Sequence, residues 1–145
     1  MVQLFRGIEE IPVLAREGAI VPLKNMEVFD NDTDNPKSLE IKIFPGKTGS
    51  FTYGKLKETV VEESWVETKL EKAQEEGKDC FIIHSPQGNT AVLPEKRCWK
   101  LDFVKIKENT VSVLVDGKET AYKATVEKNG MCIEITEVPV NAEIK

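Results

Sequence analysis

Residues that could carry out chemistry are few in this 145-residue chain. His84 is the one histidine, and it lies at the end of the apolar run FIIHS. A nucleophile needs a base beside it, and the sequence contains no local signature of a Ser-His-Asp or Cys-His arrangement. A histidine that alternates with apolar residues on a strand is more often structural or simply exposed than catalytic. The sequence therefore indicates no catalytic residue.

Two other motifs resemble ligand sites only in part. In DNDTDN, Asp30, Asp32 and Asp34 alternate as at the start of a calcium loop, but such a loop also needs glycine at its sixth position and glutamate at its twelfth. Asn35 and Ile41 occupy those positions, so a solvated turn is favoured over a looser calcium site made with remote residues. We expect no metal site.

The stretch PGKTGS contains Gly46 and Gly49, but its spacing differs from that of a phosphate loop. It also leads into SFTY, which is not the start of a helix. We expect neither phosphate binding nor a cofactor.

Aromatic side chains offer the remaining binding chemistry, since their rings can stack on sugars. Trp99 shares a strand face with Leu101 and Phe103 in WKLDF and is expected in the core. Trp65 lies among charged residues in EESWVET and is expected to be exposed. The candidate ligand-binding residues are Trp65, Tyr53 and Tyr122, with carbohydrate as the expected ligand.

Charge and composition narrow the classes of partner. The net charge is −5 with both signs interspersed, so there is no basic face for nucleic acid or anionic lipid. No apolar run reaches the roughly 18 residues of a membrane-spanning helix. Three separated cysteines, Cys80, Cys98 and Cys132, form no Cys-x-x-Cys pair. They are expected as buried or half-buried thiols, and they favour a reducing compartment, the cytoplasm.

Period-two alternation predicts strands through most of the chain. It occurs in SLEIKIF, WKLDF, TVSVLV (Val111, Val113, Val115) and CIEIT, which we interpret as strands of one antiparallel system. Turn signals at VDGK and KNG predict two hairpins near the C-terminus, and EEGK predicts another turn after VETKLEKAQ. The fold class predicted is an all-β antiparallel β-sandwich.

Propensity alone favours a helix for residues Val66 to Glu76. They are strong helix formers, with Val66, Leu70 and Ala73 at helical spacing and Gly77 placed like a C-cap. The preceding residues, with β-branched side chains and Trp65, have no clean period, so helix and strand remain open on the residues themselves.

Three motifs in order resemble a known family. IPVLAREGAIVPL, then NPKSLEIKIFPGKTGSFTY, then LPEKRCWKLDF are similar to the C-terminal part of glycoside hydrolase family 31, which includes α-glucosidases and α-xylosidases. The resemblance implies that residues 1–24 are terminal strands of a proximal sandwich and that 25–145 form a distal C-terminal β-sandwich. It also favours a strand for Val66 to Glu76. One departure is GKLKETVVEE, which stands where the family has an acidic turn after SFTY.

The resemblance implies an accessory role for this chain. Both catalytic aspartates of the family lie in an upstream barrel, so none can be assigned to a position here. The expected function is a noncatalytic accessory sandwich of an α-glucosidase-like enzyme, with a carbohydrate-binding module as the alternative. Expected partners are the barrel and proximal sandwich, or a second copy through Ile11 to Leu23. We expect Val2 to Leu23 to be disordered or to form a dimer contact.

Overall fold

Alternating side chains give the strand Ser38–Ile43 (β2) one core face and one open face. In the computed structural model, which describes residues 14–24, 35–58, 63–106 and 110–145, its buried residues are Leu39, Ile41 and Ile43. The strand Lys96–Val104 (β7) alternates in the same way and buries every second residue from Arg97 to Leu101. These two strands form the centre of one layer.

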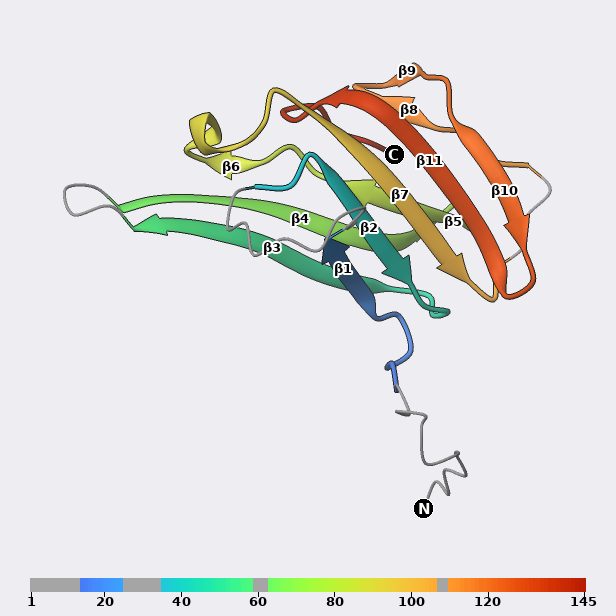
Figure 1. The fold of residues 1–145 in the computed structure, drawn as a ribbon. Coiled ribbons are helices and arrows are strands. Elements are labelled where there is room, and N and C mark those ends of the chain that lie inside the picture. The colour runs from blue at the N-terminus through green and yellow to red at the C-terminus, as the bar shows by residue number, and fades with distance from the viewer. Residues whose placement is uncertain (1–13, 25–34, 59–62, 107–109) are drawn as a thin grey trace.

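Two sheets pack face to face (Figure 1). The five-stranded sheet has the order β1 (Ile20–Lys24), β2, β7, β11 (Gly130–Pro139) and β10 (Lys123–Glu127). The second sheet contains β3 (Gly49–Glu58), β4 (Glu63–Glu75) and β5 (Lys78–Ile83), with β6 (Gln87–Gly88) also paired to β4. The small hairpin β8 (Leu114–Val115) and β9 (Lys118–Glu119) is joined to β5 by Ile144, which bridges Ile83 and Val115. A short 3₁₀ helix, η1 (Thr90–Val92), precedes β7. The predicted all-β sandwich is confirmed.

The core lies between the two sheets. It is a single cluster of buried apolar side chains from both layers, among them Ile41, Leu70, Ile83, Trp99 and Ile135. The rings of Phe81 and Phe103 meet edge to face with their centroids 6.0 Å apart. Because both sheets supply this one core, neither layer is expected to fold without the other.

The strand predicted for Val66 to Glu76 is confirmed, against its helix propensity. β4 pairs with β3 on one side and with β5 on the other, and Leu70 lies opposite both Phe51 and Ile83. Central pairing and burial of one face outweigh intrinsic propensity. Gly77 follows as a turn residue with φ of 80° after Glu76 with φ of 50°, a pair that suits a two-residue hairpin and is not a helix cap.

The two predicted C-terminal hairpins are confirmed. Asp116 and Gly117 connect β8 to β9, with φ of 50° and 74°. Lys128 and Asn129 connect β10 to β11.

The expectation of one purely antiparallel system is wrong at β2, because β2 and β7 pair in parallel from Ser38–Cys98 to Ile43–Phe103. The chain between them passes through the whole second sheet before it returns. A long connection of this kind permits two strands to run in the same direction. The hairpin rule, which applies to neighbouring strands in sequence, could not reveal it.

The strand predicted for Val111 to Val115 is longer than the strand in the structure. Only Leu114 and Val115 form β8. Val113 is buried and Val111 packs against the core, so burial explains the apolar alternation without ladder pairing.

The strand β1 belongs to the same sheet as β2, with register from Ile20–Ile43 to Lys24–Leu39. Ile20 is buried in the core. The strand formed by Ile20–Lys24 therefore belongs to the same sheet as strands from residues 25–145. Residues Val2–Val13 lie outside the described part of the chain. No helix within the described ranges is long and apolar enough to cross a membrane.

Candidate functional site

Trp65 lies on the outer face of the sheet formed by β3, β4 and β5. Its side chain is 51% exposed, while its neighbour Val66 is buried toward the core. Glu67 follows on the same outer face, since side chains alternate along β4. The predicted exposure of Trp65 is confirmed.

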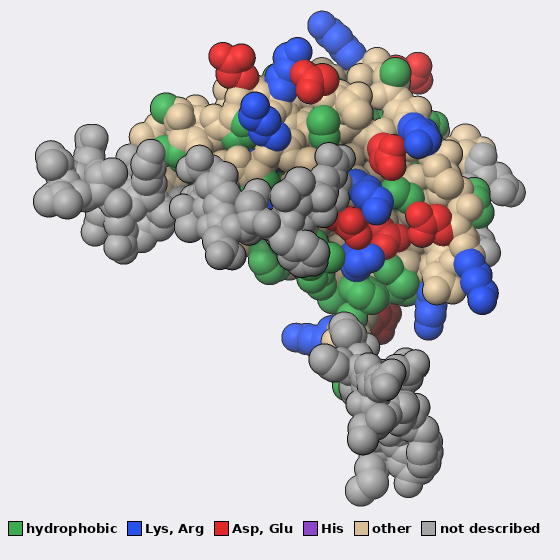
Figure 2. Space-filling model, viewed as in Figure 1, with side chains coloured by type: hydrophobic (Ala, Val, Ile, Leu, Met, Phe, Trp, Pro, Cys, Tyr) green, Lys and Arg blue, Asp and Glu red, His purple; other side chains and the backbone are tan. Residues whose placement is uncertain are grey.

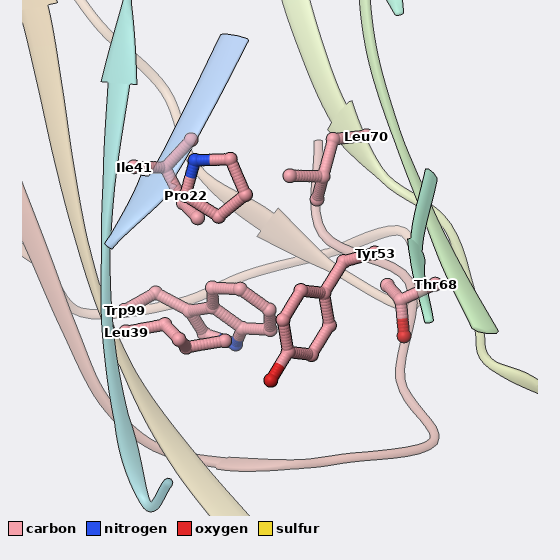
Figure 3. A pocket seen from close by; sticks show the side chains of 7 residues that line it. All are labelled: Pro22, Leu39, Ile41, Tyr53, Thr68, Leu70 and Trp99. Carbon is pink, nitrogen blue, oxygen red and sulfur yellow. The ribbon is translucent and has the colours of Figure 1, made fainter. Parts of the chain in front are cut away.

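Tyr53 lies on the opposite face of the same sheet. Tyr53 on β3 pairs with Thr68 on β4, whose side chain is buried, and its ring packs against the core. Figure 3 shows its ring beside Trp99 and Leu39 in a gap between the sheets that is too narrow for a water molecule. Tyr53 and Trp65 therefore do not share a surface.

Tyr122 lies between β9 and β10, away from the sheet that carries Trp65. Its ring is partly exposed, and its hydroxyl group donates a hydrogen bond of 2.7 Å to the carbonyl oxygen of Val111. The structure does not bring the three predicted aromatic residues together into one site.

His84 belongs to a surface cluster of charged side chains. Its Nε2 lies 2.9 Å from the Glu71 carboxylate and its Nδ1 lies 3.6 Å from that of Glu143. Lys69 also pairs with Glu71 at 2.7 Å, and hydrogen bonds from Lys69 and then His84 lower the pKa of Glu71. Neither contact of the imidazole is to a hydroxyl or thiol, so the cluster does not form a nucleophile and base.

The glycines of PGKTGS have a packing role. A Cβ on Gly46 would lie 2.4 Å from the nitrogen of Gly18, and one on Gly49 would lie 2.0 Å from its carbonyl oxygen. The Gly18 amide donates a 2.6 Å hydrogen bond to Pro45. These glycines let the segment before β1 contact the β2–β3 turn at backbone distance.

Metal-binding arrangements are absent from the described ranges: no group of three or more potential ligands is found there. The aspartates of DNDTDN lie outside those ranges. The three thiols are free, with Cys132 buried and the other two half-buried. Burial raises the pKa of Cys80 and of Cys132, which favours the unreactive thiol form.

Arg97 is a buried arginine that sequence reasoning missed. It is 1% exposed, its Nε donates to the Pro36 carbonyl oxygen at 3.0 Å, and its guanidinium carbon lies 5.4 Å from the centre of the Trp99 ring. Its Nη2 has no hydrogen-bond partner among the described residues, and burial lowers its pKa. Arg97 thus connects the residues just before β2 to the core, and its buried guanidinium group is not accessible to a dissolved ligand.

The outer face of the five-stranded sheet carries a network of paired charges. Glu40 lies 3.2 Å from both Lys42 and Lys100, and Lys42 lies 2.8 Å from Asp102. Burial alone would raise the pKa of Glu40, but hydrogen bonds from the two lysines outweigh it and the pKa is lowered. Figure 2 shows positive and negative side chains interspersed on the surface, beside apolar side chains gathered around β1.

Comparison with known proteins gives a match in structure alone. No protein-family model and no curated protein sequence matches the chain. A variant of the Flavobacterium johnsoniae GH31 dextranase in complex with isomaltotriose matches with a TM-score of 0.62 and 16% identity, over 88% of this chain and 19% of that one. The same dextranase in complex with glucose matches with a TM-score of 0.60 and 17% identity, again over 88% of this chain and 19% of that one.

The chain therefore spans about a fifth of the length of the solved proteins that it matches. At this identity the likeness establishes a shared fold. The resemblance stated from the three sequence motifs is confirmed at that level: this chain has the β-sandwich fold found in part of a glycoside hydrolase family 31 dextranase.

Proposed function

We propose that this chain is a noncatalytic accessory β-sandwich of a family 31 glycoside hydrolase. The observation that carries the proposal is the fold match, which covers 88% of this chain but 19% of a dextranase. The dextranase was solved with isomaltotriose and with glucose, which supports a parent enzyme that cleaves α-glucosidic bonds. By the family resemblance, that parent uses a retaining mechanism with two carboxylates in its barrel. In this proposal, the sandwich stabilises the catalytic unit and helps to position its domains.

The docking surface in this proposal is the outer face of β1. Val21 and Leu23 are 37% and 39% exposed there, and Leu14 precedes them with its side chain largely in solvent. β1 is the terminal strand of its sheet, so one of its backbone edges is unpaired within that sheet. An apolar strip on an edge strand favours a protein partner. We assign it to the barrel and proximal sandwich of the parent.

A direct test mixes the purified chain with the family 31 catalytic unit of its source genome and measures mass by light scattering. A one-to-one complex is expected, and the Val21→Asp/Leu23→Asp double variant should abolish it. Val126→Asp is the matched control, because Val126 is also exposed but lies on β10 at the far edge. A homodimer of the chain alone that the double variant dissolves would assign the strip to a second copy. No complex at all would contradict the docking proposal.

A second candidate function is carbohydrate binding, favoured by the exposed ring of Trp65. Tryptophan and tyrosine offer a broad apolar surface with a polar edge, which suits ligands that combine apolar and hydroxyl-bearing faces. We also propose a cytoplasmic location, supported by three free cysteines.

A further inference from the structure

We infer that Trp65, Glu67 and Gln87 form a binding site for a neutral oligosaccharide on the outer face of β4 and β6. This inference deepens the second proposed function, carbohydrate binding, and it does not depend on the accessory role. It assigns two residues that sequence reasoning did not single out.

The surroundings of Trp65 leave its ring accessible. Gly88 on β6 lies against the indole, where a Cβ would be 3.0 Å from Cε3 and 2.4 Å from the Trp65 carbonyl oxygen. Gly88 also has φ of 101°, so a side chain there is excluded on two grounds. On the other side, β3 contributes Gly54, diagonal to Trp65, where an added Cβ would have open space except for one backbone oxygen at 3.8 Å. Backbone without a side chain thus lies beside the ring at Gly88 and Gly54, while Leu56 is the residue paired directly opposite Trp65 on β3.

Two polar side chains beside the ring are uncommitted. Glu67 and Gln87 are exposed and lie directly opposite each other in the β4–β6 pairing. Within the described residues, neither side chain makes a hydrogen bond or ion pair, in contrast to Lys69 and Glu71 farther along β4. The amide of Asn89 donates to the Trp65 carbonyl oxygen at 2.8 Å, which holds the segment after β6 against β4.

The spacing suits one sugar unit beside the ring. Trp65 and Glu67 are two residues apart on one strand face, about 7 Å, and directly opposite residues such as Glu67 and Gln87 have Cβ atoms about 5 Å apart. A carboxylate accepts two hydrogen bonds in a plane, while an amide both donates and accepts. Adjacent hydroxyl groups of a pyranose match this pair, while the C–H face of the next ring can lie on the indole.

Charge and polarity favour a neutral sugar over other ligands. The Glu67 carboxylate and the net charge of −5 repel acidic sugars and nucleic acids. Along β4, the next residues on the same face are Glu67 and Lys69, which are exposed and polar, as is Thr52, the partner of Lys69 on β3.

The test is titration of the isotope-labelled chain with maltotriose and isomaltotriose, followed by NMR of the two indole N–H signals. Trp65 is expected to shift in a saturable way, while buried Trp99 stays in place as an internal control. A chain titrated with a glucuronate-containing oligosaccharide should show no shift. If Trp65 does not move at millimolar neutral sugar, the inference is overturned.

Variants locate the binding site by calorimetry. Trp65→Ala is expected to weaken affinity by at least about tenfold, and Glu67→Gln or Gln87→Ala by several-fold. Val126→Ala, on the other sheet, is the matched control and should bind as the parent chain does. Sugar binding that survives Trp65→Ala would overturn this site but keep carbohydrate binding. A shift of Trp65 caused only by the catalytic unit would overturn the site in favour of a protein contact.

Discussion

The outer face of the five-stranded sheet and the surface around Trp65 on the other sheet differ in how their polar groups are used. On the five-stranded sheet, Glu40, Lys42, Lys100 and Asp102 neutralise one another across β2 and β7. On the β3–β4–β5 sheet, a half-exposed tryptophan stands beside a carboxylate and an amide that no described residue engages. A satisfied network stabilises the fold, whereas uncommitted groups around an aromatic ring are available to a ligand.

The comparison also separates the two tryptophans. Trp99 is 5% exposed on the inner face of β7, and Trp65 is on the outer face of β4. Residue type is the same in both cases, so sheet face alone decides whether the ring belongs to the core or to the surface.

The largest effect is expected from replacing Trp99. Trp99→Ala should lower the free energy of unfolding by about 3–5 kcal/mol, because it removes a buried ring and leaves a cavity. Trp65→Ala should change it by less than about 1 kcal/mol, since the outer ring packs on one side only. Urea unfolding followed by circular dichroism measures both. Equal losses of unfolding free energy in the two variants would contradict the assignment of Trp99 to the core and Trp65 to the surface.

A smaller and pH-dependent effect is expected at Glu40. Its pKa in the folded chain lies below its ordinary value of 4.5, so its ion pairs stabilise the fold above that pH. Glu40→Gln should therefore cost about 1 kcal/mol at neutral pH, and the difference from the parent chain should shrink as the pH falls below 4.5. Urea midpoints measured from pH 7 to pH 3 check this. A difference that does not depend on pH would show that the network contributes nothing by charge.

The smallest effect on stability is expected at Glu67. Glu67→Gln should leave the free energy of unfolding within about 0.5 kcal/mol, because this exposed carboxylate has no partner to lose among the described residues. Thermal unfolding of the variant beside the parent chain gives the comparison. Destabilisation as large as that of Glu40→Gln would mean that Glu67 has a structural role.

Much of the architecture could be predicted because alternation and turn chemistry are local. The buried residues of β2 and β7 and the two C-terminal hairpins follow from period two and from Asp116–Gly117 and Asn129. The strand at Val66 to Glu76 required the family resemblance, because its propensity favours helix. The parallel pairing of β2 with β7 depends on a connection through the other sheet, which no local pattern encodes.

The candidate site could be predicted only in part for the same reason. Exposure of Trp65 follows from its charged neighbours, and Glu67 follows once β4 is accepted as a strand. Gln87 lies beside Glu67 only because the two-residue strand β6 pairs with β4. Tyr53 points toward the core because it pairs with Thr68, which lies on the inner face of β4. Arg97 alternates with Trp99 and Leu101 on β7, but its charge argues against burial, and its hydrogen bond to Pro36 depends on the start of β2.

The most direct test of the accessory role is the thermal half-life of α-glycosidase activity. The family 31 catalytic unit of the source genome would be assayed on an aryl α-glucoside with and without this chain, and the chain would be assayed alone. We predict no turnover by the chain and a longer half-life of the catalytic unit when the chain is present, lost with Val21→Asp/Leu23→Asp. Turnover by the chain itself, or an unchanged half-life, would contradict the account.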